Sequence, residues 1–200
     1  MRLPVMTVLC TTLIATAVPV RADVLTPDEL VAELAKGGLV IYFRHAQTEA
    51  DYADQVTADP GLCASQRVLS EAGWQQARAI GSAVAALDIP VSEVLSSEYC
   101  RAWQTADLAF GSYAKTPALN FEPAESYTDA QTAAMRDRVL PLMLAPVTPG
   151  TNRVIVGHDD PFEAVTGIYP EPQGVAFVLR ADGRAISVLG SIAPDAWPAR

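Results

Sequence analysis

One short apolar run, Leu39 to Phe43, most constrains what this chain can fold into, because it ends abruptly in an arginine and a histidine. The run has no polar alternation and contains β-branched and aromatic residues, which is typical of a strand buried on both faces of a parallel sheet. In open α/β sheets, ligands lie just beyond the carboxyl ends of the strands. The sequence therefore predicts a strand that delivers Arg44 and His45 to a binding or catalytic site.

The only other histidine of the chain, His158, follows a second short apolar run at 154–156. A lone histidine near a strand is more often a satisfied core or rim residue than a functional one. Two histidines at the mouths of two predicted buried strands instead favour a shared site. Neighbouring guanidinium groups favour the neutral imidazole, which is a nucleophile.

Apolar periodicity predicts strands that alternate with helices along the chain. Helices are expected over about 27–35, 71–87, 100–110 and 128–144, the last kinked or ended by Pro141. Strands are expected over 91–95, 119–121 and 153–156, and a hairpin over 175–179 and 185–189. This order predicts an α/β fold: a three-layer α/β/α sandwich with a mixed, mainly parallel central sheet.

Residues 1–22 have the pattern of a secretory signal peptide: a positive start, an uncharged apolar stretch, and small or apolar residues before the cleavage position. We expect cleavage after Ala22, one catalytic domain over 23–200, and a secreted or periplasmic location. Two prolines and the shortness of the stretch argue against a spanning anchor, so no membrane insertion is expected after cleavage.

The formal net charge is −9, and loss of the two arginines in 1–22 would make it more negative by two. An acidic chain is a poor binder of nucleic acid or anionic membranes, so neither partner is expected. An anionic substrate would also be repelled unless arginines cluster locally. Arg101 follows the predicted strand 91–95 and joins Arg44 as a candidate, because guanidinium forks bind phosphate bidentately and helix N-termini favour anions.

Two of the three cysteines, Cys63 and Cys100, lie outside the predicted signal peptide. An even pair in an oxidising compartment predicts a disulfide. Such a bond would close a long loop and contribute roughly 3–4 kcal/mol in the loop-entropy treatment. Two buried free thiols are the alternative.

Three motifs, in order, resemble those of the histidine phosphatase superfamily, the phosphoglycerate-mutase-like superfamily with an Arg-His-Gly signature. They are Arg44-His45-Ala46-Gln47-Thr48, then Leu95 to Ala102 with Thr105-Ala106, and finally Val156-Gly157-His158. The resemblance spans about residues 38–189. It implies that His45 is the nucleophile and becomes a phosphohistidine that water hydrolyses. It also implies that Arg44, Arg101 and His158 hold the phosphoryl group, with Thr48 beside them, and that neither cofactor nor metal is needed.

The chain departs from the family pattern at two positions near the first motif. Ala46 replaces the glycine of the signature and adds one methyl group. Asp51 stands where many members have an asparagine that lines the phosphate pocket, and a carboxylate there would repel phosphate unless it is protonated or turned away.

The proton donor to the leaving group is left open by the resemblance. Many members carry a glutamate after the strand that follows the second arginine, which fits Glu122 or, less well, Glu125. The other main branch uses an aspartate directly after the second histidine, which is Asp159 here. Glu98 is a third candidate.

The expected function is hydrolysis of a phosphomonoester, through a phosphohistidine, on a small phosphorylated substrate outside the cytoplasm. A phosphate- or phosphoester-binding module without turnover is the main alternative, and a phosphomutase is another. A metal site of the two histidines with Asp159 or Asp160 is disfavoured, because two arginines would repel a divalent cation. Substrate selection is expected in segments 49–67 and 121–130.

Overall fold

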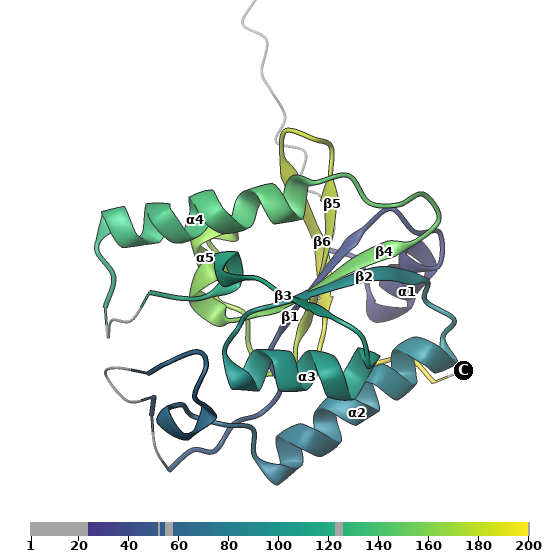
Figure 1. Cartoon of the computed structure of the whole chain (residues 1–200). Coiled ribbons are helices and arrows are strands. Elements are labelled where there is room, and N and C mark those ends of the chain that lie inside the picture. Colours follow the sequence, from purple (N-terminus) through teal and green to yellow (C-terminus); the bar gives the residue numbers. More distant parts are fainter. Residues whose placement is uncertain (1–23, 52, 55–57, 123–125, 200) are drawn as a thin grey trace, which may run out of the picture.

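A mixed six-stranded sheet forms the centre of the molecule (Figure 1). The computed structural model describes residues 24–51, 53, 54, 58–122 and 126–199; the predicted signal peptide and Glu125 lie outside them. The strands are β1 (Val40–Arg44), β2 (Val91–Ser96), β3 (Ala114–Lys115), β4 (Asn152–Gly157), β5 (Ala176–Ala181) and β6 (Ile186–Ile192). Their spatial order is β3-β2-β4-β1-β5-β6, in which the first four strands are parallel and the β5–β6 hairpin is antiparallel.

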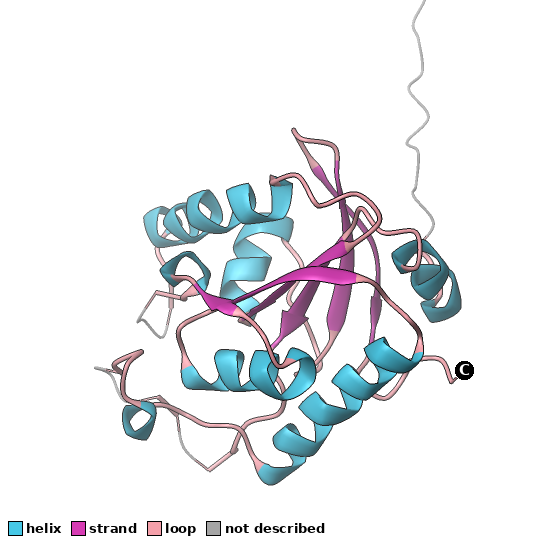
Figure 2. Cartoon of the chain, turned by 45° about the vertical axis from the view of Figure 1, so that its right-hand side comes forward, coloured by secondary structure: helices cyan, strands magenta, loops and turns pink. Residues whose placement is uncertain are grey.

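Helices cover both faces of this sheet (Figure 2). They are α1 (Pro27–Leu34), α2 (Glu71–Ala86), α3 (Cys100–Phe110), α4 (Asp129–Leu144) and α5 (Asp159–Thr166), with short 3-10 turns at η1 (Cys63–Ser65) and η2 (Pro117–Leu119). Helices α1, α2 and α3 share one apolar cluster with the sheet, and α4 and α5 share the other. The predicted three-layer α/β/α sandwich with a mainly parallel sheet is therefore confirmed.

Strand β1 supplies side chains to both clusters, since successive strand residues point to opposite faces. Ile41 and Phe43 pack towards α1, α2 and α3, whereas Val40 and Tyr42 pack towards α4 and α5. All five residues of β1, Arg44 included, are buried. This double burial explains why the run shows no polar alternation.

The sequence-based expectations fail at three places outside the central strands. The predicted strand 119–121 is absent: Pro117 opens a 3-10 turn capped by the Thr116 side chain, and the edge strand is β3, which begins five residues before the predicted one. Helix α4 continues through Pro141, held by the buried side chains of Val139 and Met143. Helix α5, directly after His158, was not anticipated because it has only eight residues.

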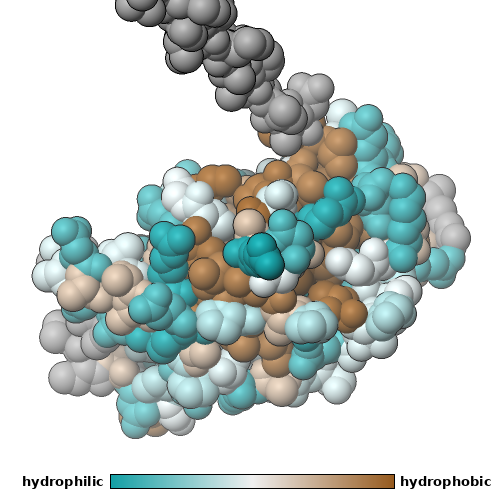
Figure 3. Space-filling view, turned by 90° about the horizontal axis from the view of Figure 1, so that it is seen from above, coloured by the Kyte–Doolittle hydropathy of each residue, from teal (hydrophilic) through white to brown (hydrophobic). Residues whose placement is uncertain are grey.

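The surface is mixed in character. Seen from above, hydrophobic side chains occupy the middle of the face with hydrophilic ones around them (Figure 3). The large apolar side chains that are exposed come from separate parts of the chain: Val24, Leu62, Trp74, Ile168 and Tyr169. Among the described residues, no helix has the length and apolar character that crossing a membrane requires.

Candidate active site

The sheet brings the three sequence motifs to one edge. Strands β1 and β4 are parallel neighbours with Arg44 opposite Gly157, so the two histidines that follow them emerge side by side. Their ring centroids are 5.4 Å apart. Strand β2 flanks β4 on its other side, and α3, which carries Arg101, begins four residues after β2 ends. Residues more than a hundred positions apart in sequence therefore form one buried cluster.

The close approach of β1 and β4 depends on a glycine. The Tyr42 hydroxyl donates to the carbonyl of His158 at 2.8 Å and accepts from the N–H of His158 at 3.1 Å. A Cβ at position 157 would lie 2.3 Å from that hydroxyl oxygen, so only glycine leaves room for it. Tyr42 thus fixes the backbone that presents the His158 ring, and burial keeps its hydroxyl protonated by raising its pKa.

His45 is held so that its unprotonated ring nitrogen faces Arg101. Its Nδ1 lies 2.8 Å from the carbonyl oxygen of Ala46, and since a carbonyl only accepts, Nδ1 carries the proton. Its Nε2 is then a lone pair, which accepts from Arg101 Nε at 3.2 Å. Burial, followed by the charge of Arg101, holds the pKa of His45 well below its usual value. The imidazole is therefore neutral and nucleophilic at neutral pH.

Arg101 has a carboxylate partner from the long loop after β1. Its Nη1 pairs with Asp54 at 2.9 Å, and its guanidinium lies over the Phe121 ring, 5.1 Å from the centroid. Asp51, the carboxylate that the sequence places near the phosphate pocket, is exposed instead. Asp54, three residues later, is the acid of this loop that reaches the arginine.

Arg44 is clamped from the α5 side. Its Nη2 pairs with Asp159 at 2.6 Å and its Nη1 donates to the carbonyl of Pro170 at 2.9 Å. The Tyr169 hydroxyl donates to the same carboxylate at 2.8 Å. Burial alone would raise the pKa of Asp159, but Arg44 and the Tyr169 hydroxyl outweigh it and hold that pKa below its usual value. In this arrangement Asp159 is ionised at neutral pH.

Buried polar atoms without a partner mark where an anion fits. Among the described residues, Arg44 Nε, Arg67 Nε and His158 Nδ1 are buried and make no hydrogen bond. Such atoms are costly unless a ligand or water satisfies them. Arg67, whose charge acts on both Arg101 and His158, is a third arginine of the cluster. The phosphoryl contacts predicted for Arg44, Arg101 and His158 remain predictions with a consistent geometry.

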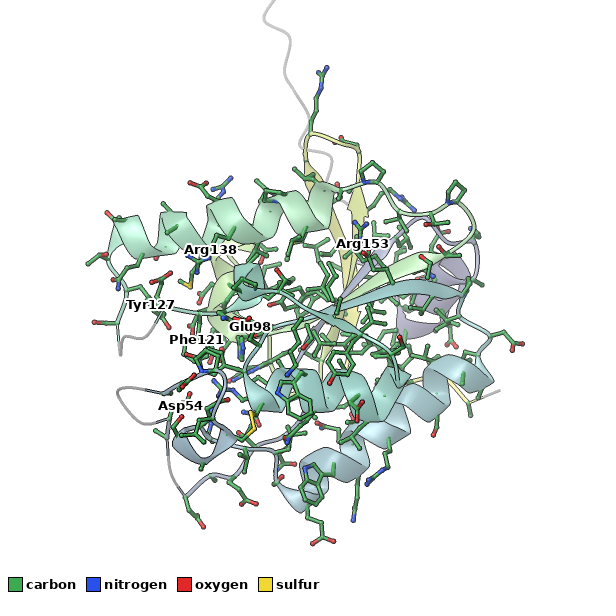
Figure 4. The ribbon with its side chains drawn as sticks, in the orientation of Figure 1. Asp54, Glu98, Phe121, Tyr127, Arg138 and Arg153 are labelled. Atoms are coloured by element: carbon green, nitrogen blue, oxygen red, sulfur yellow. A yellow bond between two sulfur atoms is a disulfide. The ribbon has the colours of Figure 1, made fainter. Side chains whose placement is uncertain are left out.

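The other candidate proton donors bind elsewhere. Glu122 pairs with Arg138 of α4 at 2.7 Å. The preceding side chain, Phe121, packs on the His158 ring, with the ring centroids 4.8 Å apart; Arg138 and Phe121 are labelled in Figure 4. Glu98 accepts from the Asn120 amide at 2.9 Å. Of the proton-donor candidates Glu98, Glu122 and Asp159, which the structure describes, Asp159 is the one that contacts a site arginine.

Two further expected features lie at the rim of the cluster. Thr48 is buried, and its N–H donates to the side chain of Gln173 at 2.9 Å, so its phosphate contact stays a prediction. Cys63 and Cys100 form the predicted disulfide, with Cα atoms 5.6 Å apart. Gln66 also accepts from the N–H of Cys100 at 2.7 Å, so the loop is fastened beside Arg101.

No three described His, Cys, Asp or Glu side chains are grouped as metal ligands.

Residues that sequence reasoning missed lie mostly in this loop and behind the histidines: Tyr42, Asp54, Arg67, Ser97, Asn120 and Tyr169. Arg67 carried one usable signal, because it is a cation within a segment otherwise rich in aspartate. The others look like ordinary strand, loop or turn residues, and only their partners reveal a role.

Comparisons with known proteins agree with this geometry. Residues 40–122 match the family model of the histidine phosphatase superfamily (branch 1). The comparison with curated proteins finds no sequence relative of this chain. Among solved structures, the fold is similar to the protein histidine phosphatase SixA complexed with tungstate, with 14% identity, 78% of this chain and 97% of that chain covered, and a TM-score of 0.51.

Two other similar structures carry phosphate-like or phosphorylated ligands. A phosphoserine phosphatase variant from Entamoeba histolytica, in complex with phosphoserine, is 11% identical over 78% of this chain and 98% of that chain, with a TM-score of 0.57. A mycobacterial glucosyl-3-phosphoglycerate phosphatase, whose structure includes VO3, is 17% identical over 82% of this chain and all of that chain, with a TM-score of 0.56. At these identities the likeness shows the fold.

Proposed function

Because residues 40–122 match the family model of the histidine phosphatase superfamily, we propose that the chain is a member of this family and hydrolyses phosphomonoesters through a phosphohistidine at His45. The observation that carries the proposal is the His45 ring: buried, neutral, with its Nε2 lone pair facing Arg101. A neutral nucleophile beside always-charged guanidinium groups is what phosphoryl transfer needs. The substrate is a small phosphorylated molecule.

The reaction takes two displacement steps at phosphorus. In the first, His45 Nε2 attacks phosphorus, the bond to the ester oxygen breaks, and the leaving oxygen takes its electron pair and a proton from an acid. In the second, water attacks phosphorus, the N–P bond breaks, and its electron pair returns to Nε2 while the water proton passes to the same acid. Arg44 and Arg101 hold the phosphoryl oxygens through their guanidinium N–H groups.

Asp159 is the acid that we assign to the leaving group. It is paired with Arg44 in the absence of substrate, and that pairing keeps it ionised. A phosphoryl group bound to Arg44 would compete for the same guanidinium and add negative charge beside the carboxylate. Both effects raise the pKa of Asp159, so substrate binding itself would prepare the acid.

The proposal includes a location outside the cytoplasm. It is supported by the signal-peptide pattern at 1–22 and by the Cys63–Cys100 disulfide, a bond favoured in oxidising compartments. Sequencing the N-terminus of protein recovered from the export fraction tests it, with Asp23 as the expected first residue. Intact Met1 on soluble protein in the cytoplasm would contradict it.

The test of the activity uses residues 23–200 and p-nitrophenyl phosphate from pH 4 to 8 in the presence of EDTA. We expect turnover that survives EDTA, falls by several orders of magnitude in His45→Ala, as it does when other hydrolases lose their nucleophile, and falls strongly in Arg101→Lys. Arg153→Lys is the matched control, because Arg153 lies at the far end of the sheet (Figure 4). Turnover retained by His45→Ala would refute the nucleophile, and phosphate binding without turnover would favour the binding-module alternative.

A further inference from the structure

A chain of hydrogen bonds leads from His158 Nε2 through Ser97 and Asn120 to Glu98. The Glu98 carboxylate accepts from Asn120 Nδ2 at 2.9 Å, Asn120 Oδ1 lies 2.7 Å from Ser97 Oγ, and Ser97 Oγ lies 2.9 Å from His158 Nε2. The members come from the ends of β2 and η2 and from the residue after β4. Each side chain has a fixed number of protons to donate, so the donor and the acceptor of every bond in the chain can be assigned.

The orientation of the Asn120 amide is fixed twice. Its Nδ2 faces the Glu98 carboxylate, and a carboxylate only accepts. Its Oδ1 accepts from the backbone N–H of Glu98 at 3.0 Å, and a backbone N–H only donates. Turning the amide over would place donor against donor and acceptor against acceptor. Asn120 therefore presents an oxygen to Ser97.

That oxygen determines where the single Ser97 proton goes. An amide oxygen only accepts, so the Ser97 hydroxyl donates to Asn120 Oδ1. Ser97 Oγ then has only lone pairs left, and one of them accepts from the backbone N–H of Tyr99 at 3.2 Å. The remaining contact is the one to His158 Nε2, which can be a hydrogen bond only if Nε2 carries a proton.

From this accounting we propose that Glu98, Asn120 and Ser97 are positioning residues that lock His158 in the Nε2–H tautomer, with an unprotonated Nδ1 as the ring atom left for a ligand. His45 has the opposite tautomer, since its Nδ1–H donates to the carbonyl of Ala46. Burial, then the charges of Arg101, Arg44 and Arg67, hold the pKa of His158 well below its usual value, so no second proton is present at neutral pH.

The consequence of this tautomer for phosphate binding rests on the proposed function. His158 Nδ1 is buried without a partner, and the His158 ring lies beside the Tyr99 and Phe121 rings, within the field of the three arginine charges. A fully ionised phosphoryl oxygen against that lone pair would be repelled. The phosphoryl group therefore enters with one proton, which is shared between its oxygen and Nδ1, so phosphate binding is coupled to retention or uptake of a proton.

Nitrogen NMR reads the tautomers directly, because the chain has only two histidines. Protein labelled with ¹⁵N at both histidine rings, at pH 7.5 without ligand, gives four ring nitrogen signals. We expect one ring protonated at Nδ1 and the other at Nε2, with His45→Gln leaving only the Nε2–H ring. A His158 ring protonated at Nδ1 would overturn the proposal, whatever the enzyme's activity.

Two variants test the chain that sets the tautomer. In Asn120→Leu the Ser97 proton is released and can turn to His158 Nε2, so we expect the His158 proton to move to Nδ1 while the His45 signals stay unchanged. The double variant Glu98→Gln with Asn120→Asp reverses amide and carboxylate but still offers Ser97 an oxygen, so it should keep Nε2–H. An Asn120→Leu protein with native His45 signals and an unchanged His158 tautomer would show that the chain does not set it.

Inorganic phosphate is the probe for the coupled proton. We expect its addition to move the Nδ1 signal of His158 towards the protonated position, at a pH where the free ring is neutral. Phosphate that binds, as seen at His45, yet leaves Nδ1 unprotonated would refute the coupling. Because neither measurement involves turnover, failure here is distinguishable from failure of the proposed hydrolysis.

Discussion

Removing the Cys63–Cys100 disulfide is the perturbation whose size follows most directly from the structure. The two cysteines are 37 residues apart in sequence. In the chain-entropy treatment, closing a loop of that length lowers the entropy of the unfolded chain and stabilises the fold by about 4 kcal/mol at 25 °C. For a domain of this size that corresponds to a fall in Tm of roughly 8–16 °C when the bond is lost.

The measurement is urea unfolding of residues 23–200 with and without Cys63→Ala and Cys100→Ala. Wild type in dithiothreitol should match the double variant, and the double variant should not respond to dithiothreitol. A loss of less than about 1 kcal/mol in the free energy of unfolding would refute the reasoning, because the loop of the unfolded chain would then be almost as constrained without the bond as with it. Turnover of the double variant, measured below its unfolding transition, separates the effect on stability from the effect on loop placement. Gln66 and Asp54 still fasten the loop to Cys100 and Arg101 of α3 when the disulfide is absent. We therefore expect KM to rise more than kcat falls.

Two further predictions concern protons. His45 and His158 have folded-state pKa values below the unfolded value of about 6.5, so the unfolded chain binds more protons as the pH falls below about 6.5. The free energy of unfolding should therefore be constant above that pH and decrease below it. The slope should approach about 2.7 kcal/mol per pH unit, which is about 1.36 for each histidine. Urea titrations from pH 7.5 to 5 test this, and a flat profile would contradict burial of two neutral imidazoles. For the proton donor, Asp159→Asn should lower turnover of an alkyl phosphate by about 10²–10⁴-fold and that of p-nitrophenyl phosphate far less, because nitrophenolate needs no proton to leave. Glu122→Gln is the matched control, and the reverse pattern would move the acid to Glu122.

The sequence alone predicted the elements whose signal is local. The run before Arg44, the N-cap and first proline of α1, and the periodicity of α2 and α3 depend on neighbours in the chain, and these elements appear near their expected bounds. The motif order then predicted which residues would meet, because parallel strands place their carboxyl ends together. The cysteine pair was predicted from compartment chemistry.

Tertiary structure decided the pairing between segments, which no local pattern encodes. Which loop aspartate reaches Arg101 depends on how the loop is fastened to α3, so Asp54 reaches it whereas Asp51 lies exposed. Glu122 pairs with Arg138, whereas Phe121, next to it in sequence, packs against His158. The proton positions on the two histidines follow from partners across the sheet, because a tautomer is set by the atom opposite each ring nitrogen rather than by the neighbouring sequence.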